Sequence, residues 1–265
     1  MINDRPTIAL VNTPQDAHRQ LAFSLRMDWG LTGAEAIGAT CDVAVVVDVL
    51  SFTTTLTVAA DRGVVVFPYP WRDDRAERFA ADQGATLSVG RSQATAGQVS
   101  LSPRSVRAAS SLERLVLPSP NGSTISFGLA QTTSEVIGVS LRNRRAAADW
   151  IVARRAQNPS LRVAVIAAGE RWPDKTLRPA VEDLWGAGAL IDVLRTAGWL
   201  TISPEAHAAA AAFRMVADDL EPSLSNCASG QELIDIGYAD DVRTAGELDD
   251  SRSVPLLLGN AFGPA

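Results

Sequence analysis

The sequence predicts a three-layer α/β/α protein in which helices cover both faces of a mostly parallel or mixed sheet. Short runs of Val, Ile, Leu and Ala alternate along the chain with longer amphipathic stretches, as strands and helices alternate in such folds. The apolar runs contain few polar positions, which is typical of strands buried on both faces. We expect residues 1–265 to form a single domain, either as one unit or as two closely packed lobes.

The hydrophobic pattern also predicts where the elements lie. Strands are predicted at residues 42–50, 64–70, 114–120, 134–140 and 161–169. Helices are predicted at residues 51–63, 71–85, 121–131, 142–157 and 180–198, with Ser51 as a helix N-cap and Gly63 as a helix stop. The chain after about residue 200 is predicted to be rich in helix and then irregular.

The composition disfavours several classes of function. The formal net charge is −6 and the pI is about 5.0, so the phosphate backbone of nucleic acid would be repelled. No apolar stretch approaches the roughly 20 residues needed to span a membrane. Residues 1–15 lack a basic region followed by an apolar run, and the two cysteines are far apart in the sequence. We therefore expect a reduced, cytoplasmic protein without a signal peptide.

Histidine is too scarce for several common kinds of catalytic site. The histidines are His18 and His207, and His207 lies in an alanine-rich helical stretch. Neither accompanies a nucleophile motif, which disfavours Ser-His-Asp and Cys-His mechanisms, and the same scarcity disfavours zinc. Carboxylate chemistry remains, and carboxylate oxygens suit hard cations such as Mg²⁺.

Polar residues follow three of the predicted strands. They are Asp48 after the first, Asn121, Gly122 and Ser123 after the second, and Glu170 and Arg171 after the third. Ligands of open α/β sheets bind beyond the carboxyl ends of the strands, where helix N-termini also point. Because a helix N-terminus favours anions, the hydroxyls of Ser51, Thr53 and Thr54 and the backbone of residues 121–123 are candidate phosphate contacts.

The predicted helix at residues 180–198 adds two further acids. Glu182 and Asp183 lie near its start, and Gly186 and Gly188 follow inside it. Each interior glycine costs roughly 1 kcal/mol relative to alanine, which indicates close packing against another backbone. Such packing could bring one of the acids to a metal at the sheet edge.

Five short motifs occur here in the order known from one family. They are DVLSFTTT, PSPNGST, AAGERW, VEDLWGAG and SGQELIDIGYADDV…VP. On these motifs the chain resembles the ComB family of 2-phosphosulfolactate phosphatases, over about residues 42–255. The resemblance implies an α/β/α fold and a Mg²⁺-dependent removal of phosphate from 2-phospho-3-sulfolactate in coenzyme M biosynthesis. The expected partner is a small anionic phosphorylated substrate.

The resemblance also implies candidate roles for individual residues. Asp48 and Glu170 are the candidate catalytic residues, and the candidate Mg²⁺ ligands are Asp48, Glu170, Glu182 and Asp183. The candidate substrate contacts are Ser51, Thr53, Thr54, Arg91, Asn121, Gly122, Ser123 and Arg171.

The chain departs from the family pattern at three motifs. Ser51 and Phe52 stand where the family commonly has an Arg-Ala pair, and that arginine is suited to bind phosphate or sulfonate. The family's Gly-Glu-Arg and Asn-Ser-Pro sequences are altered at residues 89–91 and 101–103. The arginines that could supply the missing positive charge are Arg26, Arg91 and Arg171.

The residues leave the mechanism and the substrate open. Asp48 could attack phosphorus to form an aspartyl phosphate, or a metal-held water could be the nucleophile. A haloacid-dehalogenase-type phosphatase is disfavoured, because Leu50 stands where that class needs a second Asp. The protein could also be an enzyme acting on a different organophosphate, or it could bind an anionic metabolite without hydrolysing it. A homo-oligomer is compatible with the sequence.

Overall fold

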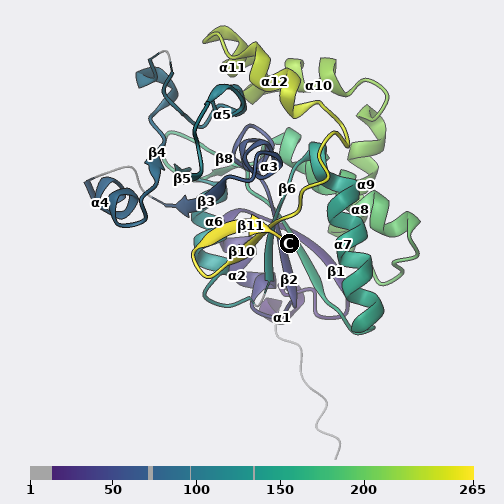
Figure 1. Ribbon diagram of the computed structural model, residues 1–265. Helices are drawn as coiled ribbons and strands as arrows, with labels where there is room; N and C mark the ends of the chain where they lie inside the picture. The colour runs from purple at the N-terminus through teal and green to yellow at the C-terminus, as the bar shows by residue number, and fades with distance from the viewer. Residues whose placement is uncertain (1–13, 71–73, 96, 134) are drawn as a thin grey trace, which may run out of the picture.

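The computed structural model describes residues 14–70, 74–95, 97–133 and 135–265. At its centre lies a nine-stranded sheet with the strand order β1-β7-β2-β6-β10-β11-β3-β5-β4 (Figure 1). Most of the N-terminal segment used to predict that no signal peptide is present lies outside the described residues. Residues 71–73, at the start of one predicted helix, lie outside them as well.

The sheet consists of two parallel groups of strands joined by an antiparallel hairpin. One group is β1, β7, β2 and β6, and the other is β3, β5 and β4. The hairpin β10–β11 pairs with β6 on one side and with β3 on the other. The strands are β1 Leu25–Trp29, β2 Val43–Val47, β3 Val65–Tyr69, β4 Thr86–Leu87, β5 Arg114–Pro118, β6 Glu135–Val139, β7 Val163–Ala167, β10 Pro255–Leu258 and β11 Ala261–Pro264. The prediction of a mixed sheet is confirmed.

The C-terminal hairpin overturns the prediction that the chain ends irregularly. It occupies the middle of the sheet, where Leu256 pairs with Ile137 and Phe262 pairs with Val66 (Figure 1). Each of its strands has only four residues, too few to show a clear alternating pattern. The partners that make this segment a sheet lie far away in the sequence.

Helices cover both faces of the sheet, as predicted. In β2, Val43, Val45 and Val47 face a core beneath α7, α8 and α9, whereas Ala44 and Val46 face a second core beneath α2, α3 and α6. All five side chains are fully buried, which explains why this run contains no polar residue. The helices are α2 Gly30–Gly38, α3 Phe52–Asp61, α6 Gly122–Leu129, α7 Arg144–Gln157, α8 Val181–Thr196 and α9 Pro204–Val216.

The remaining helices have at most nine residues each and lie around this central unit. α4 packs against the second parallel group, and α5 contacts α12 (Figure 1). These helices are α1 Pro14–His18, α4 Asp74–Asp82, α5 Pro103–Ala108, α10 Leu220–Asn226, α11 Ala228–Asp235 and α12 Ala239–Ala245. In the described part of the chain, no helix combines the length and apolar character needed to cross a membrane.

Two glycines allow α8 to lie close to its neighbours. A Cβ atom on Gly188 would lie 2.0 Å from the carbonyl oxygen of Ala209 in α9, and one on Gly186 would lie 2.6 Å from a methyl group of Val49. The prediction of close packing against another backbone is confirmed for Gly188, whereas Gly186 packs against the side chains of Val47 and Val49. Because α8 lies against the end of β2, Asp183 in its first turn reaches the backbone of Val49.

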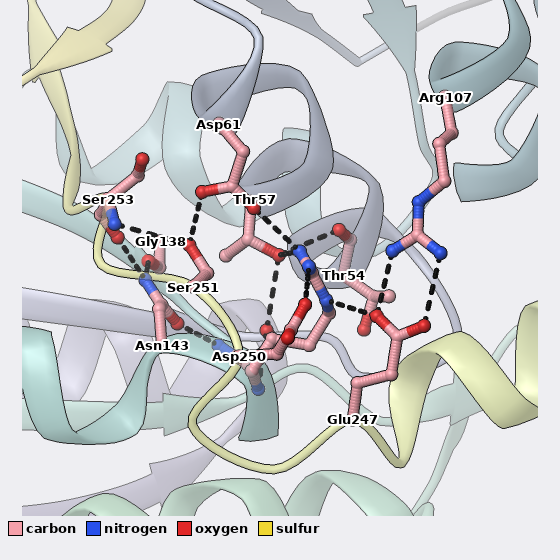
Figure 2. A network of polar contacts seen from close by, with 12 residues as sticks. Thr54, Thr57, Asp61, Arg107, Gly138, Asn143, Glu247, Asp250, Ser251 and Ser253 are labelled. Atoms are coloured by element: carbon pink, nitrogen blue, oxygen red, sulfur yellow. Dashed lines mark hydrogen bonds and ion pairs between the residues drawn. The ribbon is translucent and has the colours of Figure 1, made fainter.

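A buried arginine ties the C-terminal segment to α3. Arg142 is 2% exposed, and its guanidinium forms ion pairs of 2.8–3.0 Å with Asp61, Glu247 and Asp250. Figure 2 shows these acids converging from α3 and from the segment between α12 and β10, with Arg107 bound to Glu247 from the side. Since unpairing a buried charge is costly, this network holds the chain that leads into the hairpin.

We expect Gly188→Ala to lower the free energy of unfolding by about 1–3 kcal/mol, because its Cβ has no room against α9. This loss should occur although alanine is the better helix former. Urea unfolding followed by circular dichroism measures it. Gly263→Ala is the control, because no atom lies within 4 Å of its Cβ position, and its effect should stay below about 0.5 kcal/mol. Equal stability of the two variants would contradict the packing described.

Candidate active site

The carboxylate of Asp48 lies between the N-termini of two helices. Asp48 follows β2 and is 5% exposed. Its Oδ1 accepts the N–H of Phe52 at the start of α3 (3.1 Å), and its Oδ2 accepts the N–H of Gly122 at the start of α6 (2.8 Å). A Cβ atom on Gly122 would lie 2.7 Å from that Oδ2, so only glycine fits here. The N–H of Gly122, which lies in the backbone predicted to contact phosphate, is therefore bound by Asp48 itself.

Asp183 fastens two strand ends together. Its Oδ1 accepts the N–H of Val49 after β2 (2.7 Å), and its Oδ2 accepts the N–H of Gly169 after β7 (2.8 Å). Burial, followed by the charges of Asp48 and Glu182, raises the pKa of Asp183 well above its usual value. With both oxygens bonded to the backbone, Asp183 is suited to shape the site, and its role as a metal ligand stays a prediction.

Glu170 is the acid whose protonation changes near neutral pH. It begins the short strand β8 (Glu170–Arg171) and pairs with Arg178 of β9 (Leu177–Arg178). Asn121 donates a 2.9 Å hydrogen bond to its Oε2. Burial raises the pKa of Glu170 to about 7, and the negative charge of Asp48 adds to the rise. A carboxyl group with this pKa can accept or release a proton at neutral pH, as general acid–base catalysis requires.

The site concentrates negative charge without a basic partner in contact. Burial raises the pKa of Asp48, and the charge of Glu182 adds to that rise. Among the described residues, no Arg or Lys forms an ion pair with any of the four acids, which are Asp48, Glu170, Glu182 and Asp183. Oxygen donors of this kind suit Mg²⁺ in their chemistry. The same residues include no group of three or more His, Cys, Asp or Glu side chains that could hold a metal ion.

Three predicted substrate contacts are turned into the protein. Thr53, Thr54 and Ser123 are fully buried. Each donates its hydroxyl proton to a backbone carbonyl at 2.6–2.8 Å. A phosphate oxygen accepts hydrogen bonds, so a hydroxyl whose proton is already donated has none to offer it. The arrangement argues against direct phosphate contact by these residues and favours a role in shaping the loops.

Arg91 reaches the loop that follows Asp48. Its Nη2 donates to the Oγ of Ser51 at 2.6 Å and lies 3.3 Å from the carboxylate of Asp241. Ser51 therefore occupies the N-cap position of α3 without a capping hydrogen bond from its side chain. Burial raises the pKa of Asp48, and the charge of Arg91 opposes that rise. Arg91 thus brings positive charge to a loop in which the family arginine is replaced by serine.

The other two arginines lie elsewhere. Arg26 is fully buried in β1, where its guanidinium binds Thr40 and the carbonyl of Arg19, so it supplies no charge to this site. Arg171 is exposed and lines a cavity of about 370 Å³ together with Asn121 and Glu170.

A second cavity, of about 510 Å³, is lined by Arg91 and Ser119. The hydroxyl of Ser119 lies 3.5 Å from Oδ2 of Asp48, which places this cavity beside the acids. Arg91 and Arg171, both predicted to bind substrate, therefore line different cavities, and consecutive residues of one segment, Pro120 and Asn121, line the two.

Four residues contribute to the site without having been singled out in the sequence. Ser119 contacts Asp48, Asp241 pairs with Arg91, and Arg178 faces Glu170. Burial, followed by the charge of Glu182, raises the pKa of the Cys227 thiol to about 12, so this thiol stays protonated. Ser119 and Asp241 lie inside quoted motifs and could have been found there, whereas nothing local marks Arg178 or Cys227.

Acids, an amide and arginines that collect beyond the strand ends of an α/β/α sheet are typical of a binding site for a small ligand. Comparison with known families specifies the class further. The model of the 2-phosphosulpholactate phosphatase family matches residues 33–260, and the chain belongs to this family of phosphatases. The matched range includes every candidate site residue described above, so the resemblance seen in the motifs is confirmed.

In metal-free protein, we expect Glu170→Gln to raise the free energy of unfolding at about pH 8. Because burial raises the pKa of Glu170 from 4.5 to about 7, the wild type loses stability as pH rises through this range, whereas the amide does not ionise. The gain is at most about 3 kcal/mol, at roughly 1.4 kcal/mol per pKa unit. The glutamine keeps an oxygen for Asn121. Thermal unfolding in EDTA at several pH values tests this, and a gain that persists at about pH 4 would contradict it.

Proposed function

We propose that this protein is a Mg²⁺-dependent phosphomonoester hydrolase and that 2-phospho-3-sulfolactate is the substrate to test first. The family to which the chain belongs is named for that ester. One observation carries the proposal: Asp48, Glu170, Glu182 and Asp183 interact at the strand ends without an ion pair to any described Arg or Lys. Uncompensated negative charge of this kind fits a cation that is bound together with an anionic substrate.

The proposed setting of the reaction is the cytoplasm, within coenzyme M biosynthesis. Cys41 and Cys227 are both free, which suits a reducing compartment. The proposed reaction converts 2-phospho-3-sulfolactate and water to 3-sulfolactate and inorganic phosphate.

Asp48 and Glu182 are the proposed Mg²⁺ ligands. Glu182 is 2% exposed, and no described basic side chain pairs with it. Protein sites for Mg²⁺ in phosphoryl transfer usually contribute one or two carboxylates, and waters and substrate phosphate complete the coordination. Two carboxylates are therefore enough, with Asp183 holding the strand ends in place. When bound, the ion would neutralise phosphate oxygens and lower the pKa of a water molecule.

Glu170 is the proposed general base. With a pKa of about 7 it is partly ionised at neutral pH and can take the proton of the attacking water. Asn121 fixes the orientation of this carboxylate through its 2.9 Å hydrogen bond. Arg91 and Arg171 are the proposed contacts for the anionic groups of the ester, because a guanidinium donates hydrogen bonds well to phosphate and carboxylate oxygens.

Phosphate release should require both the metal and the acids. Wild-type protein should release phosphate from 2-phospho-3-sulfolactate with Mg²⁺ and stop in EDTA. Asp48→Asn and Glu182→Gln should each lower kcat/KM by at least about 100-fold, because metal ligands act as a set. The exposed Glu113→Gln is the control and should keep full activity. If no ester in a broad panel is hydrolysed by folded protein at any Mg²⁺ concentration, a binding protein is the better description.

Water, rather than Asp48, is the proposed nucleophile. Each oxygen of Asp48 already accepts a backbone N–H bond, and the lone pairs that remain are those proposed to bind Mg²⁺, so none is left to attack phosphorus. Reactions with ³²P-labelled ester, quenched with acid during turnover, should therefore contain no labelled protein. Label recovered on Asp48 would establish an aspartyl phosphate and overturn this part of the proposal.

A further inference from the structure

The two cavities beside the acids differ in the number of cationic side chains that line them. The cavity of about 370 Å³ is lined by two cationic side chains, Arg171 and Lys175, together with Glu170 and Asn121. The cavity of about 510 Å³ is lined by a single charged side chain among the described residues, that of Arg91. Glu170 offsets one of the two positive charges, but the first cavity still offers two cationic hydrogen-bond donors to a phosphate group. It therefore suits the phosphate and leaves the second cavity for the organic part of the ester.

The walls of the larger cavity are mainly apolar. The apolar residues that line it are Pro70, Leu101, Pro118, Pro120, Leu233 and Ile236. Its volume lies within the roughly 300–1,000 Å³ that is typical of sites for drug-sized molecules. The cavity therefore has room for a substituent well beyond the three carbons of a lactate, and it offers that substituent an apolar surface.

The positive charge in this cavity is already partly neutralised. Arg91 lies 3.3 Å from Asp241, whose side chain is fully buried, and it also donates to Ser51. A second anionic group on the substrate would compete with Asp241 for the same guanidinium. Burying an incompletely paired anion against proline and leucine costs free energy.

One apolar residue of the wall remains open to solvent. Ile236 follows α11 and is 62% exposed, while Leu233, one turn earlier, is 7% exposed. An apolar substituent in the cavity would cover Ile236 and remove that surface from water, which favours binding in proportion to the area covered.

We propose that this enzyme prefers 2-phospho acids with an apolar substituent at carbon 3 over those with a sulfonate or only hydrogen there. The inference rests on the proposed phosphatase activity and changes its preferred substrate: 2-phospho-3-sulfolactate is then hydrolysed, but less efficiently than an ester with an apolar group. Arg91 then binds the carboxylate that all these esters share, and the wall formed by Leu101, Leu233 and Ile236 binds the substituent.

Three esters that differ only at carbon 3 test the preference. They are 2-phospho-3-phenyllactate, 2-phospholactate and 2-phospho-3-sulfolactate, assayed for phosphate release with Mg²⁺. The expected kcat/KM is at least about tenfold higher for the phenyl ester than for the other two, the usual scale of discrimination by an apolar pocket. Hydrolysis with no advantage for the phenyl ester would overturn the inference and leave the proposed phosphatase activity standing.

A substitution of Ile236, the exposed residue of the cavity wall, tests whether the preference arises in this cavity. Ile236→Asp changes an exposed side chain, so the protein should still fold. The ratio of kcat/KM for 2-phospho-3-phenyllactate to kcat/KM for 2-phospholactate should fall to about one, because placing an apolar group against a carboxylate costs the carboxylate its hydration. Leu200→Asp, at a site that is 86% exposed and outside the cavity, should keep the wild-type ratio. An unchanged ratio in Ile236→Asp would overturn the assignment.

Binding of the dephosphorylated products separates failure of the inference from failure of the proposed function. Calorimetry should show tighter binding of 3-phenyllactate than of lactate, with the difference lost in Ile236→Asp. If that holds while no ester is hydrolysed, the cavity assignment stands and the phosphatase proposal fails. If the two acids bind equally and no ester is hydrolysed, both fail.

Discussion

The site depends on one buried carboxylate that binds two helices at once. Asp48 accepts the first N–H groups of α3 and α6, which follow strands of different parallel groups, so it brings the ends of those groups together. Helix N-termini stabilise an anion through their free N–H groups and partial positive charge, and this compensates part of the cost of burying it. Gly122 is required by the same contact, because any side chain there would collide with the carboxylate. Without this bridge, the loop at residues 119–121 would not meet the acids.

The protein tolerates this concentration of acids because its stability is supplied elsewhere. Burial raises the pKa of Asp48, Glu170 and Asp183, which means that each ionised group destabilises the fold above its usual pKa. The two cores on either face of the sheet are apolar, and the Arg142 network fixes the far end of α3 (Figure 2). Functional sites are commonly strained in this way and stabilised by the surrounding structure.

Two cavities lined by neighbouring residues of the 119–121 segment are the proposed places for the two parts of the substrate. The first cavity contains Glu170, the proposed general base, with Arg171 and Lys175, and the second, more apolar cavity contains Arg91. Ser51 is small enough to let Arg91 reach the loop after Asp48 from another part of the chain. Arg91, 40 positions away in the sequence, therefore brings positive charge to this loop, and its role as a replacement for the family's arginine stays a prediction.

The sequence by itself determined the α/β/α class, the position of β2, and the close packing at Gly188, because these follow from local periodicity and residue size. It also indicated that Asp48 and Glu170 would lie near each other, because the ends of parallel strands share an edge. Only the tertiary structure placed the C-terminal hairpin in the middle of the sheet, since pairing between distant segments leaves no local pattern. Likewise, only the tertiary structure decided that Thr53 turns its hydroxyl inward, because the direction of a single proton depends on which acceptor the fold places beside it.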